Sequence, residues 1–192
     1  MHGITPDWLR HSLLAVAATA MLAGCAEDNP TGPAAELATA GTSTDQVAVD
    51  LGECDRLRPP AGSTLVIHVY ARGVQIYRWD GASWTPVGPS AQLFADANSK
   101  ALVGTHSTGP TWKSTSGSIV VGEVIDRCTP DADAIQWLLL RAARSEGPGV
   151  FLGVTHIQRV NTVGGKAPAE PGTVGQVREI PYTAEYFFYR AP

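Results

Sequence analysis

One histidine near the middle of the chain is the residue best suited to chemistry. His106 ends an apolar run and precedes the turn residues Gly109 and Pro110. An imidazole at such a place can act as an acid or a base near neutral pH. Arg159 could complement it, because a guanidinium holds a carboxylate or stabilises an oxyanion. Asn161 is two residues further on and is expected on the same face of the strand as Arg159, in a candidate cleft.

Two aromatic residues could contribute to binding. Trp112 follows the Gly-Pro turn, and Tyr182 lies in an aromatic segment near the C-terminus. Either ring could stack on a ligand. The alternative is structural: the rings fill the core, while His106 and Arg159 bond to neighbouring turns. The residues alone leave both interpretations open, with core packing favoured for the two rings.

Sequence motifs for other chemistries are absent. The chain has no Gly-x-Ser-x-Gly elbow, no His-Glu-x-x-His helix, no Walker loop and no EF-hand loop. His68, His106 and His156 could in number make an open zinc site, but His68 lies within an apolar run. We therefore expect neither a metal nor a cofactor.

The first residues have the pattern of a targeting signal. Arg10 precedes the apolar run Leu13–Ala23, which suits a signal peptide and is too short to span a bilayer. The run closes with Leu22-Ala23-Gly24-Cys25, which resembles the bacterial lipobox. The resemblance implies cleavage before Cys25 and attachment of lipid to it, which would anchor the protein to a membrane. A plain signal peptide that leaves a free thiol is the alternative.

The resemblance to the lipobox also bears on location. Ala26 follows the cysteine, where an aspartate is the usual inner-membrane retention signal of Gram-negative bacteria. We expect a lipid-anchored protein of the cell envelope, at the outer membrane if the cell is Gram-negative, and otherwise a secreted protein.

Composition divides the chain into a signal peptide (1–24), the lipidated cysteine with a tether (25–46) and a folded domain (47–192). The tether carries four acids, no base and hardly any large apolar residue, so we expect it to be disordered. Acidic and basic residues balance in the folded part. No basic patch stands out, which makes nucleic acid an unexpected partner.

The remaining two cysteines form an even set. With Cys25 assigned to lipid, Cys54 and Cys128 are left in an oxidising compartment, where a disulfide is favoured. A bridge closing so long a loop would stabilise the domain by about 4 kcal/mol. Two separate buried thiols remain the alternative, because spacing does not place the two Cα atoms within reach.

The folded part is expected to be mainly β, a single antiparallel β-sandwich or barrel-like domain with little helix. Gly and Pro number 20 and 14, and they punctuate short β-branched and aromatic runs. Thr64–Tyr70 and Val74–Trp79 are predicted to form a hairpin around the loop Ala71–Gly73. The proline in Trp84–Val87 limits that run to an edge strand.

Two further segments matter for the site. In Ile180–Tyr189, residues 182, 184, 186 and 188 share one face, and the segment is predicted to insert into the sheet. Asp131–Arg144 is the one helix candidate. Its apolar part, Ile135–Leu140, suits a buried strand equally well.

Several phrases of the folded part occur, in this order, in a known family. They are Gly73–Tyr77, Gly104–His106 with Gly109–Trp112, Trp137–Leu140, Ile157–Gly165 with Ala167-Pro168, and Pro181–Ala184 with Tyr186–Tyr189. Together they resemble the domain-of-unknown-function family 3455 of secreted bacterial and fungal proteins, over about Leu65–Arg190. The resemblance implies an extracytoplasmic, β-rich single domain with no established activity. It also favours a strand for Ile135–Leu140, since members often have proline at the position of Gln136.

The sequence reveals no reaction. The leading hypothesis is a binding or envelope-associated module that is held at the membrane by its N-terminal lipid and contacts an unknown small molecule or envelope component. The alternative is an extracytoplasmic enzyme whose cleft includes His106 and Arg159.

Overall fold

The computed structural model describes residues 49–192, so the predictions on Cys25, the signal peptide and the tether lie outside the described residues. One short 3-10 helix precedes eight strands in this part of the chain. Their bounds are η1 Gly52–Leu57, β1 Thr64–Trp79, β2 Trp84–Phe94, β3 Leu102–Ser107, β4 Thr111–Ser114, β5 Ile119–Cys128, β6 Trp137–Glu146, β7 His156–Gly164 and β8 Val177–Arg190.

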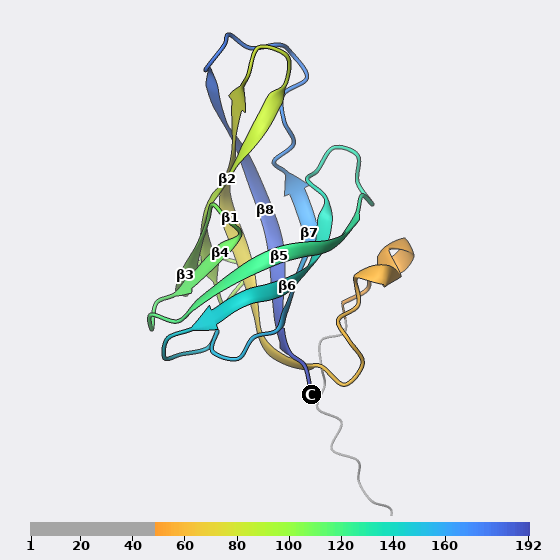
Figure 1. The fold of residues 1–192 in the computed structure, drawn as a ribbon, viewed down its shortest axis with the longest axis vertical. Helices are drawn as coiled ribbons and strands as arrows, with labels where there is room; N and C mark the ends of the chain where they lie inside the picture. The colour runs from red at the N-terminus through yellow and green to blue at the C-terminus, as the bar shows by residue number, and fades with distance from the viewer. Residues whose placement is uncertain (1–48) are drawn as a thin grey trace, which may run out of the picture. The chain divides into compact units, whose positions relative to one another are not determined.

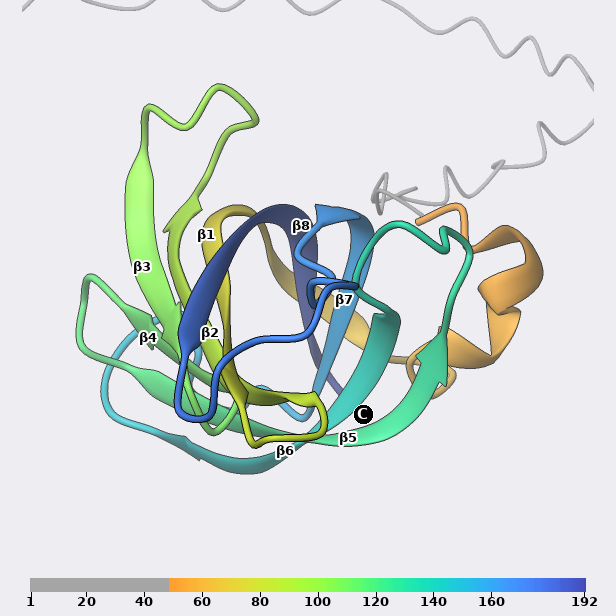
Figure 2. The same ribbon diagram turned by 90° about the horizontal axis from the view of Figure 1, so that it is seen from above.

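The strands form one antiparallel ring. Each pairs with its neighbours in sequence, and β8 also pairs with β1, so the sheet returns on itself around a central core (Figures 1 and 2). The seam is long: its register runs from Thr64 opposite Arg190 to Arg78 opposite Val177. The predicted mainly β, single-domain fold is confirmed, in its barrel-like form.

The predicted hairpin within 64–79 is wrong. β1 runs through Ala71–Gly73 without a turn and pairs with β2 and β8 along this stretch. Gly73 is there because two backbones approach closely: a Cβ at this position would lie 2.5 Å from Cα of Ala91. A glycine inside a β-branched run thus marks a close backbone contact rather than a turn.

The expected edge strand at Trp84–Val87 is the first part of a longer strand. Within the described residues, β3 pairs with β2 only over Ala91–Phe94, so residues 84–90 have β1 on one side and no strand on the other. Pro86 and Pro89 fit this place because neither has an N–H to donate to a further strand. Here β1, β2 and the start of β8 project beyond the ring (Figure 1).

The faces predicted for the C-terminal strand are those observed. Tyr182, Ala184, Tyr186 and Phe188 of β8 face the barrel interior and belong to its main core. Phe187 and Tyr189 face outward into a second apolar cluster. Because β8 pairs with β1 and β7, it is inserted in the sheet as expected.

The helix candidate is a turn followed by a strand. Asp131 accepts a bond from the backbone N of Asp133 through Oδ1, 2.8 Å, which closes a turn. β6 begins at Trp137, and both Leu138 and Leu140 join the interior, while Leu139 faces the outer cluster. Burial on both faces explains the continuous apolar run, which local propensity alone could not assign.

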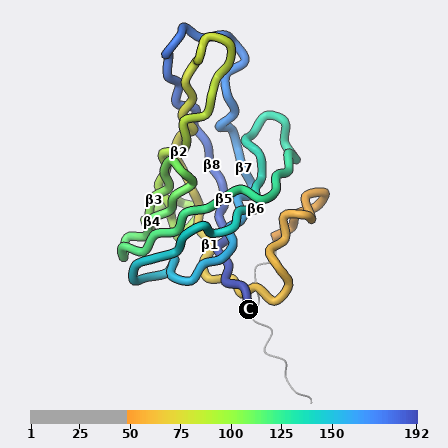
Figure 3. The backbone as a smooth tube through the Cα atoms, viewed as in Figure 1, coloured from red at the N-terminus to blue at the C-terminus, as the bar shows by residue number. Residues whose placement is uncertain are grey.

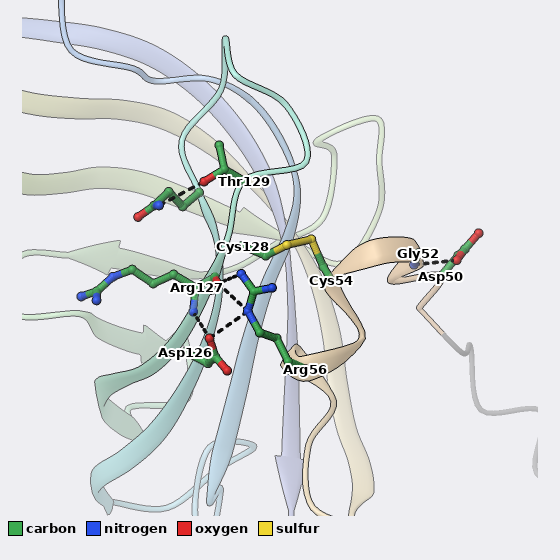
Figure 4. Close-up of a disulfide and its surroundings, with 9 residues drawn as sticks. Asp50, Gly52, Cys54, Arg56, Asp126, Arg127, Cys128 and Thr129 are labelled. Carbon is green, nitrogen blue, oxygen red and sulfur yellow. Dashed lines mark hydrogen bonds and ion pairs between the residues drawn. A yellow bond between two sulfur atoms is a disulfide. The ribbon is translucent and has the colours of Figure 1, made fainter.

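The predicted disulfide is present. Cys54 of η1 is joined to Cys128 at the end of β5, with 5.7 Å between the Cα atoms (Figure 4). The outer cluster lies around it and buries Leu57 and Phe187. Gln158 of β7 connects the sheet to η1, since its Nε2 donates to the carbonyl of Leu57, 2.6 Å. The segment before β1 is thereby fixed to the outside of the barrel.

The two ends of the barrel differ. Phe151, in the connection from β6 to β7, is buried in the core and packs on Phe188 with ring centroids 4.6 Å apart. The opposite end carries the β1–β2 projection and the loop 129–136, which rise on the same side (Figure 3). We call this second end the mouth. Across residues 49–192, no helix has the length and apolar character needed to cross a membrane.

Candidate functional site

A cavity of about 780 Å³ occupies the mouth. Its walls come from β1 and β2, the β3–β4 turn, β5, the loop 129–136, β6, β7 and the segment around Lys166. Much of the wall is apolar, including Val87, Val124, Ile135 and Leu138. A cavity of this size with apolar walls and a few polar groups is typical of small-molecule sites.

The wall near Lys166 is held by close backbone contacts. Gly165 has φ +76°, and a Cβ there would lie 2.8 Å from Cβ of Tyr182, so a larger residue would not fit. The hydroxyl of Tyr77 donates to the carbonyl of Gly165, 2.7 Å. The hydroxyl of Thr162 donates to the carbonyl of Ile135, 2.6 Å. These bonds fix both sides of the mouth relative to the barrel.

Arg159 of β7 lies where the mouth cavity meets a smaller inner one. The inner cavity has a volume of about 50 Å³ and shares Arg159, Leu138, Pro89 and Pro110 with the outer one. Nε and Nη2 of Arg159 donate to the carbonyl of Gln136, at 3.0 and 2.8 Å. An arginine has five N–H groups, so this contact orients the guanidinium without using all of them.

His106 lies against the inner cavity and is buried. Its Nδ1 donates to the carbonyl of Thr111, 3.0 Å, because a carbonyl oxygen only accepts, and Nε2 therefore carries the lone pair. Burial lowers the pKa of His106 to about 3, and the charge of Arg159 acts in the same direction. The imidazole is neutral at physiological pH.

Trp112 is buried in the core, which is the interpretation that the sequence favoured for this ring. Its indole already has His106 on one face and the edges of Tyr186 and Phe188 against it. Tyr182 is likewise buried in the core. His106, Arg159 and Trp112, three of the candidates from the sequence, all line the inner cavity.

Among the residues that the structure describes, four of the five buried side-chain groups without a regular hydrogen bond lie in the same region. They are Nε2 of Gln75, Nε1 of Trp112 and the hydroxyls of Tyr182 and Tyr186. The Tyr182 hydroxyl lies near Gln75 and the Tyr186 hydroxyl, which in turn lies near Arg159. Burial raises the pKa of both tyrosine hydroxyls, so both carry their proton. Such groups are uncommon in proteins and need an explanation.

Asn161 does not share a face with Arg159. It has φ +50°, and the pairing of β7 with β8 shifts between Val160 and Val163, which turns the side chain outward. Nδ2 of Asn161 donates to Oε1 of Glu185, 3.0 Å, beside an exterior groove of about 320 Å³. The β-bulge that causes this has no signature in the sequence.

The three histidines of residues 49–192 lie apart. His68 contacts Glu185 on the outer surface, with 2.7 Å between Nε2 and Oε2, whereas His106 faces the interior and His156 contacts Thr155. Across residues 49–192, no three His, Cys, Asp or Glu side chains are grouped as metal ligands would be.

Four polar residues of the site escaped sequence analysis: Gln75, Arg127, Lys166 and Tyr186. Tyr186 could have been found, because it shares the interior face of β8 with Tyr182. Gln75 alternates with Val74 and Ile76 along β1, but which face was interior depended on the pairing of that strand. Arg127 lies near the end of β5, and Lys166 lies in the loop between β7 and β8. Alternation of apolar and polar residues does not predict the direction of a side chain at such places.

The fold and the cavity define a class, an antiparallel barrel-like domain with an open cavity at one end. The chain belongs to the family described as "Protein of unknown function (DUF3455)", whose pattern matches residues 60–190. The family resemblance noted in the sequence is thus confirmed, with nearly the same bounds. No curated protein and no solved structure matches the chain.

Proposed function

We propose that this protein is a lipid-anchored binding module of the cell envelope that takes up a small molecule at the mouth of its barrel. The observation that carries the proposal is the cavity of about 780 Å³, which shares Arg159 and three other lining residues with the inner cavity. The hydrogen bonds of Tyr77 to Gly165 and of Thr162 to Ile135 hold the walls of this space in place. Largely preformed cavities are typical of ligand-binding proteins.

The binding proposal is tested with an uncharged fluorescent probe, N-phenyl-1-naphthylamine, titrated into the purified domain. Val87 lines the mouth and is 44% exposed, and Val177 is 45% exposed and lies outside the lining. We expect Val87→Trp to weaken probe binding by at least about fivefold, since the added volume occupies the cavity. Val177→Trp is the matched control and should bind like wild type. Equal binding by the two variants would contradict the proposal.

The lipid anchor is supported by the lipobox-like Leu22–Cys25 and by the disulfide, which is typical of oxidising compartments. Mass spectrometry of the mature N-terminus should find acyl chains on Cys25. The Cys25→Ala variant should lose its membrane association. A mature protein with an unmodified Cys25 would refute the anchor and leave the binding proposal in place.

An enzyme is the second candidate, because His106 and Arg159 line one inner cavity. It ranks second because an imidazole with a pKa of about 3 is a weak base at neutral pH. His106→Asn keeps a donor near Nδ1 and removes the Nε2 lone pair. If a turnover assay on envelope extracts finds an activity that His106→Asn abolishes while probe binding persists, the enzyme becomes the better proposal.

A further inference from the structure

The interior of the mouth offers an unusual excess of hydrogen-bond donors. The amide Nε2 of Gln75 and the indole Nε1 of Trp112 can only donate, and the protonated hydroxyl of Tyr186 can donate as well. Each of these residues is more than nine-tenths buried. A buried donor without a partner costs about 1–3 kcal/mol, which a ligand that brings acceptors would recover.

The residues that carry these donors line the cavities. Trp112 and Tyr186 line the inner cavity, Gln75 lines the outer one, and Arg159 lines both. The inner cavity of about 50 Å³ has room for a group the size of one or two water molecules. It therefore suits the polar end of a ligand, with the rest of the molecule in the larger space.

The charge of the lining has one sign. Arg159, Arg127 and Lys166 contribute to the wall, and among the residues that the structure describes no Asp or Glu does. Nζ of Lys166 donates to the carbonyl of Ala132, 2.6 Å, which holds it at the rim. The folded part as a whole has balanced charges, so this local excess of cations favours an anion at the mouth.

We propose that the ligand is an amphiphilic organic acid, whose carboxylate is bound by Arg159 and the buried donors while its apolar chain lies against Val124, Ile135 and Leu138. The inference rests on the proposed binding function. Arginine suits the head group because it pairs with carboxylates through two parallel hydrogen bonds. The apolar residues surround the outer cavity, where a chain that continues from the head group would lie. A neutral amphiphile of the same length would leave the donors and the cation unmatched.

The test is a competition in which decanoate and decanol displace N-phenyl-1-naphthylamine at pH 8. The two competitors have the same chain length and differ in the head group. Decanoate should displace the probe at concentrations at least about tenfold lower, since hydrogen bonds to a charged group are worth about 1.4 kcal/mol or more. Arg159→Met should remove this preference, so that decanoate and decanol displace the probe from this variant at similar concentrations. Arg144→Met, which removes an exposed cation of β6 outside the lining, should keep it.

The outcomes separate the two proposals. Binding of the probe with equal displacement by decanoate and decanol overturns the acid and leaves the binding function standing. Loss of probe binding to wild type overturns both. If Arg159→Met does not fold, Tyr186→Phe replaces it: it should lower the decanoate preference by about twofold or more, and an unchanged preference counts against the assigned head-group site.

Discussion

The imidazole of His106 lies flat on the indole of Trp112, with ring centroids 4.3 Å apart and an angle of 4° between the rings. The two residues are directly opposite in the β3–β4 pair. The Gly-Pro turn between them therefore serves to bring two rings together inside the barrel. The ring of Tyr186 also packs against His106, at a steep angle. This burial keeps water from the imidazole and lowers its pKa, so that it stays neutral.

We expect the burial of His106 to make stability depend on pH. Its pKa falls from 6.5 in the unfolded chain to about 3 in the folded protein. Below about pH 6.5 the unfolded chain takes up a proton that the folded protein does not. The contribution of neutral His106 to the free energy of unfolding is thus complete above about pH 6.5. It is lost as the pH falls toward 3, by at most about 1.4 kcal/mol per pH unit. Urea unfolding between about pH 5 and pH 7.5 measures the slope.

The matched variant for this prediction is His106→Asn, which cannot titrate and keeps a donor toward Thr111. It should be less stable than wild type at pH 7.5 and show a flatter dependence on pH. His156→Asn should flatten the curve less, because His156 is only partly buried. Parallel curves for wild type and His106→Asn would mean that the imidazole is open to protons in the folded state.

We expect Gly73→Ala to destabilise the domain strongly. The added methyl group would meet the backbone carbonyl of Ser90 and lie 2.5 Å from Cα of Ala91, so two strands must separate. Overpacking of this kind costs about 1–3 kcal/mol. Gly117→Ala is the control, since its Cβ would enter open space and it has only the strain of φ +99°. If the two variants unfold at the same urea concentration, the chain turns at Gly73 and does not continue through it.

We expect removal of the disulfide to cost about 4 kcal/mol, because the bridge joins residues 74 apart in sequence. Cys54→Ala with Cys128→Ala should lower the free energy of unfolding by this amount in urea. A reductant should lower wild type toward the double variant and leave the double variant unchanged. A reductant that also destabilises the double variant would show an effect unrelated to this bridge.

Features set by residues close in sequence could be predicted, whereas those set by contacts between distant residues could not. The interior face of β8 was predictable because alternation over Tyr182–Phe188 is a local property. The path of β1 was not, since Gly73 reads as a turn until β2 and β8 are known to flank it. The strand β6 was ambiguous for the same reason: burial of Leu139 on the outside depends on η1, which is distant in sequence.

The site was predictable in part. His106, Trp112 and Arg159 could be picked out by residue type and by their place at strand ends and turns, and they meet at the inner cavity. Asn161 was misplaced because a one-residue bulge reverses the face of every side chain after it. Alternation along β8 places Tyr186 in the interior, but no pattern in the sequence encodes the role of Gln75 or Tyr186 as a donor without a regular hydrogen bond.

Buried tyrosine hydroxyls of this domain fall into two groups, those that stabilise the fold and those available to a ligand. Tyr189 donates to Oε1 of Gln158, 2.7 Å, whereas Tyr186 has no partner within residues 49–192. Tyr189→Phe should lower the free energy of unfolding by about 1–2 kcal/mol because it leaves a buried acceptor unpaired. Tyr186→Phe should leave it within about 0.5 kcal/mol of wild type or raise it, since no hydrogen bond is lost. Urea unfolding of both variants measures these changes. Equal losses of unfolding free energy would show that the hydroxyl of Tyr186 stabilises the fold and is not available to a ligand.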